Sequence, residues 1–596
     1  MRNRMDVDVK DTWDLTLIYK DDDAWYEEYE SLKKEIDTYD QFQSTMMNSA
    51  QDLLELLVFD QKISRKLDKL YVYANMKSDE DKRNQTYLKM LGEITSLFTM
   101  ISKKTAYIVP TLMKYQYAKI EEWMKEEPKL LEFEHSLKDI YRYQPYTLSE
   151  TEEKLIATYS SALSKIGDTY DLLTTSDMNL GTIQDEDGND VELREGNYTL
   201  YIRSKDRRVR KQAFETLLGG YAKFQNTIAS TFTGMLELAK ANAEAHHYES
   251  TIGSYLFSDD LDETVYTNLI NVVNNHMDTL MRYYHLKKKV LGLDEMHIYD
   301  IYVDLTEKAS KTYSFEEGKN IVIDALNVLG DDYITNLKRA FMERWIDIYP
   351  TVGKTSGAYS GGSYDTLPYV LLNYNGTLND VSTIAHELGH SMHSYYTRSN
   401  NGYETGDYSI FVAEIASTVN ELLLSHYLLE HSKEKDEKRQ ILSEMMDLFK
   451  STIYRQTMFA EFERKMHGDT EEGKTLTSEQ INKAYYDLNL RYFEPEVIVD
   501  EKIQYEWERI PHFYTPFYVY KYATGLSCAC KIVTDILSGK EHAVENYIAF
   551  LKNGSKDYPK EHLKMVGIDI TKTDYIESAI AMFDDTITKM EKLLES

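Results

Sequence analysis

The sequence predicts a mainly helical protein, and three observations support this fold class. Apolar residues recur at three- and four-residue spacing through most of the 596 residues, as on the buried face of a helix. The chain has 9 prolines, where a usual frequency of about 5% would give roughly 30, so few helices are interrupted. In the first 180 residues no alternating, strand-like pattern reaches a comparable length.

The first helices follow from this periodicity. Residues 24–42 and 47–77 place apolar side chains along one helical face. A further helix is predicted over 148–163, where Ser149 followed by Glu152 forms the pattern of a capping box. We therefore expect helices in series through the amino-terminal part of the chain.

Two stretches interrupt the helical pattern. Residues 183–200 hold a DGND turn between short apolar runs, which predicts a small β-hairpin. Residues 351–380 are rich in glycine and contain a short strand-like run at 369–374, followed by an Asn-Gly turn. Beyond this stretch helical patterns continue almost to the end of the chain.

Composition limits the partners and the compartment. The net charge of −32 argues against nucleic acid and against anionic membrane surfaces, both of which attract clustered Lys and Arg. No apolar run is long enough to span a membrane, and the amino terminus lacks the apolar core of a secretory signal. Cys528 and Cys530 are too close for an unstrained bridge, which fits a reducing compartment. These features predict a cytoplasmic protein.

The strongest chemical signal follows the glycine-rich stretch. Asn379 or Asp380 can cap a helix that contains the pattern H-E-x-x-H, with His386, Glu387 and His390. Histidines four residues apart lie on one helical face and can bind one metal ion, for which Zn²⁺ is suited. Glu387 can then serve as general base on metal-bound water. We expect one zinc ion per chain.

An alternative interpretation assigns no metal to this motif, since two histidines can also lie on the exposed face of an amphipathic helix. The apolar run VSTIA before the motif argues instead for burial. His393 falls on the same face as His386, but seven residues rise about 10 Å, too far for both to bind one ion. His393 is therefore either a substrate-facing or supporting residue, or a packed core histidine.

The third ligand should come from another helix. Glu414 lies within the apolar run FVAEIA, where a carboxylate needs a partner such as a metal ion. Glu421, two turns further on, could hold a ligand histidine in place. Glu404 and Asp407 lie in a polar loop and are interpreted as turn residues.

These motifs resemble one known family. HELGH followed by FVAEIASTVNE, the run GAYSGGSYDTLPYVLLNYNGTLNDVSTIAHELGH, the early WDLTLIY and the late IPHFYTPFYVYKYATG are similar to the oligoendopeptidase F branch of the thimet-oligopeptidase metallopeptidases. The resemblance spans nearly the whole chain. It implies a bowl-like, two-part helical zincin with a deep channel and a small β element next to the metal helix.

The same resemblance implies a division of the chain and a set of roles. Residues 1–110 would form a helical region, 111–200 an oligopeptidase F amino-terminal-type domain and 201–596 the catalytic metallopeptidase domain. By motif match, the zinc ligands would be His386, His390 and Glu414, with Glu387 as the catalytic base.

A carboxy-terminal histidine and several tyrosines of the family stabilise the tetrahedral intermediate. Here His512 fits this role, with Tyr514, Tyr518 and Tyr520 as the expected catalytic tyrosines and Tyr522 nearby. Phenol hydroxyls could donate to a developing oxyanion. The alternative, a helix packed by aromatic residues, would explain at least two of these tyrosines.

A substrate-binding role is expected for the strand-like run and the glycines before it. An exposed edge at 369–374, which begins with Tyr369, could pair with an extended peptide. Gly361 and Gly362 would permit close approach of the peptide or closure of a loop.

The expected function is zinc-dependent hydrolysis of internal bonds in short peptides, with water activated by Glu387 as the nucleophile. Two alternatives remain open: a zinc exopeptidase, and a catalytically silent peptide-binding protein of the same fold. A peptide blocked at both ends separates them, because an exopeptidase has no free terminus to grip.

Overall fold

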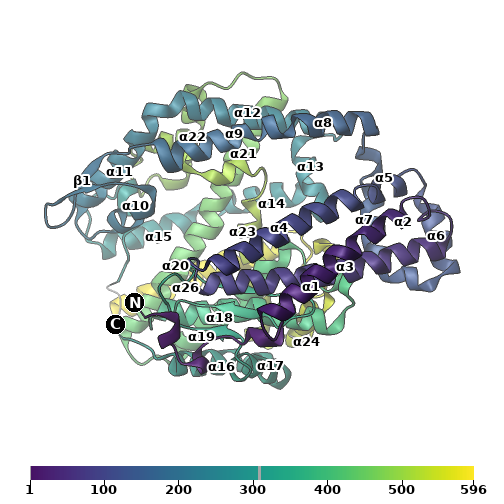
Figure 1. Ribbon diagram of the computed structural model, residues 1–596. Helices are drawn as coiled ribbons and strands as arrows, with labels where there is room; N and C mark the ends of the chain where they lie inside the picture. Colours follow the sequence, from purple (N-terminus) through teal and green to yellow (C-terminus); the bar gives the residue numbers. More distant parts are fainter. Residues whose placement is uncertain (1, 307–310) are drawn as a thin grey trace. The chain divides into compact units, whose positions relative to one another are not determined.

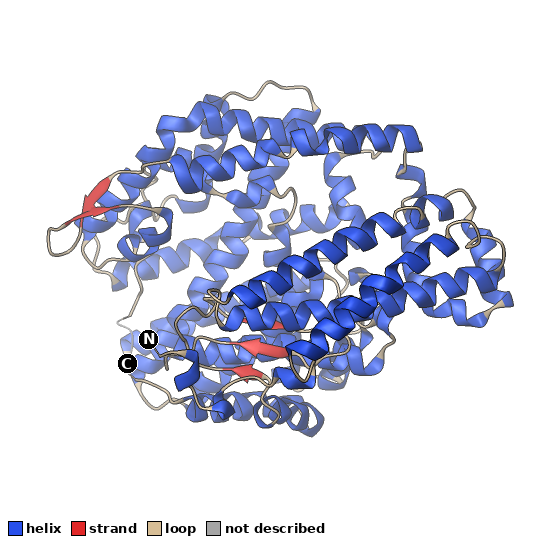
Figure 2. Cartoon of the chain, in the orientation of Figure 1, coloured by secondary structure: helices blue, strands red, loops and turns tan. Residues whose placement is uncertain are grey.

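A computed structural model describes residues 2–306 and 311–596. The chain is mainly helical, as the sequence predicts, and its strands form two small groups (Figure 2). It divides into two compact units, each built from three separate segments. Unit 1 comprises Met1–Pro145, Ser310–Tyr427 and Ile532–Ile568, and unit 2 comprises Tyr146–Ala309, Leu428–Lys531 and Asp569–Ser596. The helices α19 (Ile410–His431) and α23 (Tyr520–Leu537) each begin in one unit and end in the other.

Unit 1 contains the long amino-terminal helices and α18, the helix of the H-E-x-x-H motif (Figure 1). Besides its parts of α19 and α23, the helices of unit 1 are α1 (Asp22–Glu35), α2 (Tyr39–Phe42), α3 (Ala50–Glu80), α4 (Gln85–Thr105), α5 (Ile108–Leu112), α6 (Tyr117–Glu126), α7 (Glu134–Arg142), α16 (Phe315–Leu326), α17 (Asp331–Met342), α18 (Leu378–Asn400), α24 (Ala543–Asn553) and α25 (Pro559–Lys564). The predicted helix over 47–77 is thus confirmed as α3, and the one over 24–42 is helical but divided after Glu35.

Unit 2 is a second helical body with one hairpin. Its helices are α8 (Glu150–Leu163), α9 (Lys165–Leu172), α10 (Glu195–Ile202), α11 (Arg207–Tyr221), α12 (Gln225–Ala245), α13 (Thr251–Leu256), α14 (Glu263–Asn275), α15 (Met277–Val290), α20 (Lys435–Phe449), α21 (Arg455–Glu471), α22 (Ser478–Phe493) and α26 (Asp574–Glu595). The capping box of Ser149 and Glu152 starts α8 as predicted. The predicted hairpin is confirmed as β1 (Thr182–Gln184) paired antiparallel with β2 (Asp190–Glu192).

A three-stranded sheet in unit 1 lies against α18 and confirms the expected small β element. Its strands are β3 (Ile346–Asp347), β4 (Tyr359–Gly361) and β5 (Tyr369–Leu371), in the order β3-β5-β4. β5 runs parallel to β3 and antiparallel to β4. The Ser360 hydroxyl of β4 lies 2.8 Å from the Ser391 hydroxyl of α18, so the sheet is attached to the helix of the motif.

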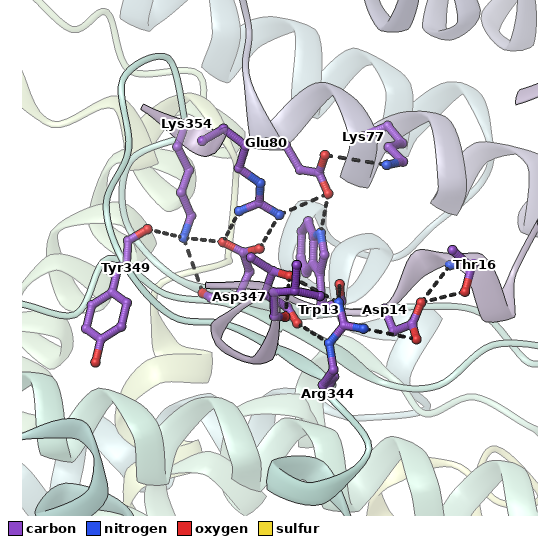
Figure 3. A network of polar contacts seen from close by, with 12 residues as sticks. Trp13, Asp14, Thr16, Lys77, Glu80, Arg344, Asp347, Tyr349 and Lys354 are labelled. Carbon is purple, nitrogen blue, oxygen red and sulfur yellow. Dashed lines mark hydrogen bonds and ion pairs between the residues drawn. The ribbon is translucent and has the colours of Figure 1, made fainter. Parts of the chain in front are cut away.

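A buried polar network ties the amino-terminal segment to this sheet (Figure 3). The Lys354 ammonium, which is fully buried, binds the Asp347 carboxylate at 2.7 Å and the Tyr349 carbonyl at 2.8 Å. Arg4 bridges Asp347 and Glu80, at 2.7 Å and 3.1 Å from their carboxylate oxygens. Burial lowers the pKa of Lys354 although Asp347 opposes the shift. Because each charge has a partner, removing one would leave another buried and unpaired.

Candidate metal centre

The helix α18 presents both histidines of the motif on one face. It begins at Leu378 and is capped by Thr377, whose hydroxyl accepts the backbone N–H of Asp380. The expected cap at Asn379 or Asp380 is therefore wrong by two or three residues, although the Asp380 side chain completes the capping box. One helical turn separates His386 from His390, and their ring centres lie 4.9 Å apart.

The middle of the motif brings a second helix close. A Cβ atom on Gly389 would lie 2.5 Å from the Ser417 Cα and 2.7 Å from the Ala416 carbonyl oxygen, so only glycine allows this approach of α19. The Asn420 amide of α19 donates to the Ala385 carbonyl of α18 at 3.0 Å. These contacts fix α19 against α18 one turn from Glu414.

The three predicted ligands meet at this crossing. The Glu414 carboxylate oxygen Oε2 lies 3.6 Å from His386 Nε2 and 3.4 Å from His390 Nε2. Tetrahedral bonds of about 2.1 Å to one zinc ion would place neighbouring ligand atoms about 3.4 Å apart. One ligand atom from each residue lies within 4.8 Å of the others. Two imidazoles and a carboxylate therefore fit one zinc ion and leave a fourth coordination position open.

Charges around the candidate ligands stabilise the protonated form of His386 and the ionised form of Glu414. Burial would lower the pKa of His386, but the Glu421 carboxylate, 3.3 Å from its Nδ1, contributes to raising the pKa to about 9. This contact is the one expected for a carboxylate that holds a ligand histidine in place. A hydrogen bond from His390 lowers the pKa of Glu414 to about 2. Glu414 is thus ionised at neutral pH.

Glu387 lies beside the two histidines of the motif, in a setting that differs from that of a free carboxyl group. Its side chain is buried, and burial raises the pKa of its carboxyl above the ordinary value, against the opposing charges of His386 and His390. A carboxylate with raised pKa takes up a proton more readily than a free one. The position therefore suits a group that accepts a proton and later returns it.

His393 does not face a substrate. Its ring is fully buried and stacks on Tyr408, with ring centres 3.7 Å apart, and Phe550 lies on α24 at 5.6 Å. Burial lowers the pKa of His393 well below its ordinary value. The packed-histidine interpretation is confirmed, and the substrate-binding one is wrong because the neighbouring aromatic rings cover this side of α18.

The expected edge strand is also wrong. β5 lies between β3 and β4, so both of its edges are already paired. Tyr369 is fully buried, and its hydroxyl donates to the Asp14 carbonyl at 2.8 Å. The outer strand beside α18 is β4, which contains Gly361. Gly361 and Gly362 line a cavity of about 550 Å³ within unit 1.

The histidine and tyrosines predicted to stabilise the oxyanion lie in unit 2, and the structure brings three of them together. The Tyr522 hydroxyl lies 3.4 Å from His512 Nε2, and the Tyr518 ring stands perpendicular to the Tyr522 ring at 5.4 Å. Burial lowers the pKa of His512, which favours its neutral form. The structure thus brings His512, Tyr518 and Tyr522 together, although Tyr522 was only a neighbour in the sequence-based set.

The other two tyrosines are packing residues. Tyr514 stacks on Tyr170 with ring centres 4.0 Å apart, and its hydroxyl lies 2.7 Å from the Thr231 hydroxyl. Tyr520 is fully buried against Tyr266. Tyr520 begins the helix α23 and turns to the core, whereas Tyr522, two residues further along the helix, points in a different direction and reaches His512.

Sequence reasoning missed one residue of the metal centre, Asn420. The sequence around it, STVNE, is largely polar, so no apolar run marked it in the way that FVAEIA marked Glu414. Its carbonyl oxygen accepts the Tyr333 hydroxyl at 3.0 Å, while its amide donates to the Ala385 carbonyl of α18.

No helix within the described residues has the length and apolar character needed to cross a bilayer.

Comparison with known proteins gives consistent matches over the chain. Residues 200–582 match peptidase family M3, and residues 112–179 match the description oligopeptidase F. Oligopeptidase PepF of Bacillus subtilis is 40% identical over 99% of this chain and 88% of that relative. Group B oligopeptidase PepB of Streptococcus agalactiae is 38% identical, over 99% of this chain and 98% of the relative.

A solved structure shows the same fold. The crystal structure of oligoendopeptidase-F from Enterococcus faecium superimposes with a TM-score of 0.75 and is 33% identical in sequence. The match covers 96% of this chain and 99% of the other.

Proposed function

Because the chain belongs to peptidase family M3, we propose that it is a zinc-dependent endopeptidase that cleaves internal bonds of short peptides. The observation that carries the proposal is the meeting of His386, His390 and Glu414, with ligand atoms at tetrahedral spacing and Glu387 beside them. Zinc accepts four ligands, and a site with three protein ligands leaves one position for water or substrate, as in catalytic zinc sites.

Bound zinc would act as a Lewis acid that acidifies water and polarises the scissile carbonyl. Glu387 takes the proton of the attacking water and passes it to the leaving amine, a role for which its raised pKa suits it. Glu421 orients His386 through Nδ1 and keeps Nε2 directed at the metal position.

His512, Tyr518 and Tyr522 are proposed to donate to the oxyanion that develops on the carbonyl oxygen. The support is the contact between Tyr522 and His512 and the aromatic packing of Tyr518 beside them. Tyr514 and Tyr520 are left out of this role because both are committed to packing.

The peptide itself is proposed to lie along β4. This strand is at the outside of its sheet, and Ser360 attaches it to α18, the helix that carries the metal ligands. Hydrogen bonds from a strand edge to a peptide backbone tolerate many side chains, which suits a peptidase of varied short substrates. Binding of one extended strand also excludes a chain that is folded.

The test is Glu387→Gln on a quenched peptide of about ten residues, blocked at both ends. We expect the variant to retain one zinc ion per chain and to lose at least about 100-fold in kcat, since Gln cannot take a proton. Glu343→Gln is the matched control, because Glu343 lies in unit 1 but binds Arg339 rather than the metal group. Full activity of Glu387→Gln would refute the assigned base.

The wild-type protein separates the alternatives on the same substrate. Cleavage that a zinc chelator abolishes supports the endopeptidase. Cleavage of the free peptide but not of the blocked one would indicate an exopeptidase, and zinc binding without any cleavage would indicate a silent peptide-binding protein.

A further inference from the structure

The turn that precedes α23 has an unusual backbone. Phe517 follows Pro516 and adopts a left-handed conformation, with φ of 54°. Residues other than glycine, asparagine and aspartate rarely adopt this conformation, and a bulky aromatic residue does so only where its surroundings hold it. The turn lies between His512 and Tyr522, and Tyr518 comes directly after Phe517. The conformation of Phe517 therefore sets where Tyr518 points.

One carboxyl group holds this turn. Glu463 of α21 is buried, and its Oε1 accepts the backbone N–H of Phe517 at 2.7 Å. The Phe517 ring packs among Tyr255, Tyr266 and His467, with ring centres 5.7, 5.7 and 4.5 Å away. The backbone bond and the aromatic contacts together keep the left-handed conformation.

The surroundings of Glu463 favour its neutral form. The Tyr266 hydroxyl lies 2.7 Å from the Ala460 carbonyl oxygen and 3.1 Å from Glu463 Oε2. The shorter contact is the one to the Ala460 carbonyl oxygen, which can only accept. When the Tyr266 proton is given to Ala460, a neutral Glu463 can donate its own proton to the Tyr266 oxygen, whereas an ionised Glu463 can only accept from Tyr266. Burial raises the pKa of Glu463 to about 8, in agreement with a neutral acid.

We propose that Glu463 is a positioning residue whose neutral carboxyl group holds the Pro516–Phe517 turn, so that Tyr518 and Tyr522 lie beside His512. The inference rests on the proposed function, in which these three residues act on the substrate. Glu463 itself is buried behind the turn and acts through the backbone of Phe517.

The neutral form makes a specific prediction about glutamine. In Glu463→Gln the amide oxygen can accept Phe517 N–H and the amide nitrogen can donate to Tyr266, so both contacts survive. In Glu463→Ala both are lost. Glu461→Gln is the matched control, since Glu461 lies on the same helix but binds Asn274, Tyr492 and Arg491 away from the turn.

A pH profile gives a readout that a structural role alone would not move. The titratable side chains packed around Glu463 are Tyr255, Tyr266 and Tyr520, whose pKa values are all raised by burial, and His467, whose pKa burial lowers to about 3. Glu463 is thus the member of this set that ionises near pH 8. Ionisation would leave a negative charge without a cation among buried rings, which favours opening of the turn to water. Wild-type kcat should therefore fall above pH 8, whereas Glu463→Gln should lack this decline.

The experiment measures kcat and KM of wild type, the two Glu463 variants and Glu461→Gln on the blocked peptide from pH 6 to 10. We expect Glu463→Gln and Glu461→Gln to match wild-type kcat within about twofold at pH 7. Glu463→Ala should lose about 10- to 100-fold in kcat with little change in KM, because misplaced groups weaken transition-state contacts.

Three outcomes would count against the inference. A folded Glu463→Ala with wild-type kcat would overturn it, and so would a Glu463→Gln profile that declines above pH 8 as wild type does. If Glu463→Ala does not fold, the glutamine profile decides alone. An inactive wild-type protein would overturn the proposed function and this inference with it, whereas an active wild type confines any failure to Glu463.

Discussion

Zinc binding by the metal-free chain should depend steeply on pH, because His386 must lose a proton to become a ligand. Glu421 Oε2 lies 3.3 Å from His386 Nδ1, and the pKa of His386 is about 9 in the absence of metal. A raised pKa means that the proton is lost as pH rises through 9. At pH 7, two units below that pKa, only about 1% of His386 is neutral.

The magnitude follows from this fraction. Between pH 7 and 8 the neutral fraction of His386 rises about tenfold, so its contribution to zinc affinity should rise about tenfold, or about 1.4 kcal/mol. Above pH 9 this contribution should level off. Removing the negative charge of Glu421 by Glu421→Gln lowers the pKa of His386, which should flatten the dependence between pH 7 and 9.

The assay is a competition titration of metal-free protein against a coloured zinc chelator at pH 7, 8 and 9. Comparison of wild type with Glu421→Gln at each pH cancels proton losses that the two proteins share, and Glu343→Gln serves as a charge-matched control. The same slope in wild type and Glu421→Gln would refute the assignment of the proton to the His386–Glu421 pair.

Two further predictions concern buried groups. Gly389→Ala would place a methyl group against the Ser417 backbone, so we expect a loss of about 1–3 kcal/mol in unfolding free energy and a lower zinc content. Gly468→Ala, in helix α21 with open space around it, should be neutral or stabilising in the same thermal melts, and equal behaviour of both variants would contradict this reasoning. Glu508 is buried with a pKa raised to about 8, so the folded state holds its proton between about pH 4.5 and 8 while the unfolded state releases it, and stability falls as pH rises. Glu508→Gln should flatten that fall, by an amount on the order of a few kcal/mol, in urea unfolding at pH 5 and 8; identical pH dependence of both proteins would exclude Glu508 as its source.

Local features of the sequence were sufficient to predict much of the fold and of the candidate metal centre. Helix periodicity, the cap at Ser149 and the DGND turn act between residues a few positions apart, and each is confirmed. The spacing of His386 and His390 is local in the same sense. Glu414 was selected on the expectation that a carboxylate within an apolar run is buried and requires a partner. Its side chain is in fact 57% exposed, and its place beside both histidines is what supports the selection.

Tertiary structure decided which faces and edges are covered. The run at 369–374 reads as a strand, but its place in the middle of the sheet depends on Ile346–Asp347 and Tyr359–Gly361, which pair with it over long separations. His393 and Tyr520 lie on faces that periodicity predicts, yet their neighbours come from α24 and α14. The sequence by itself determined the helices and the motif of the candidate metal centre, because helical periodicity and the spacing of His386 and His390 depend on local geometry. Strand order, the burial of His393 and the turn held by Glu463 depend on contacts between distant segments, which only the folded chain brings together.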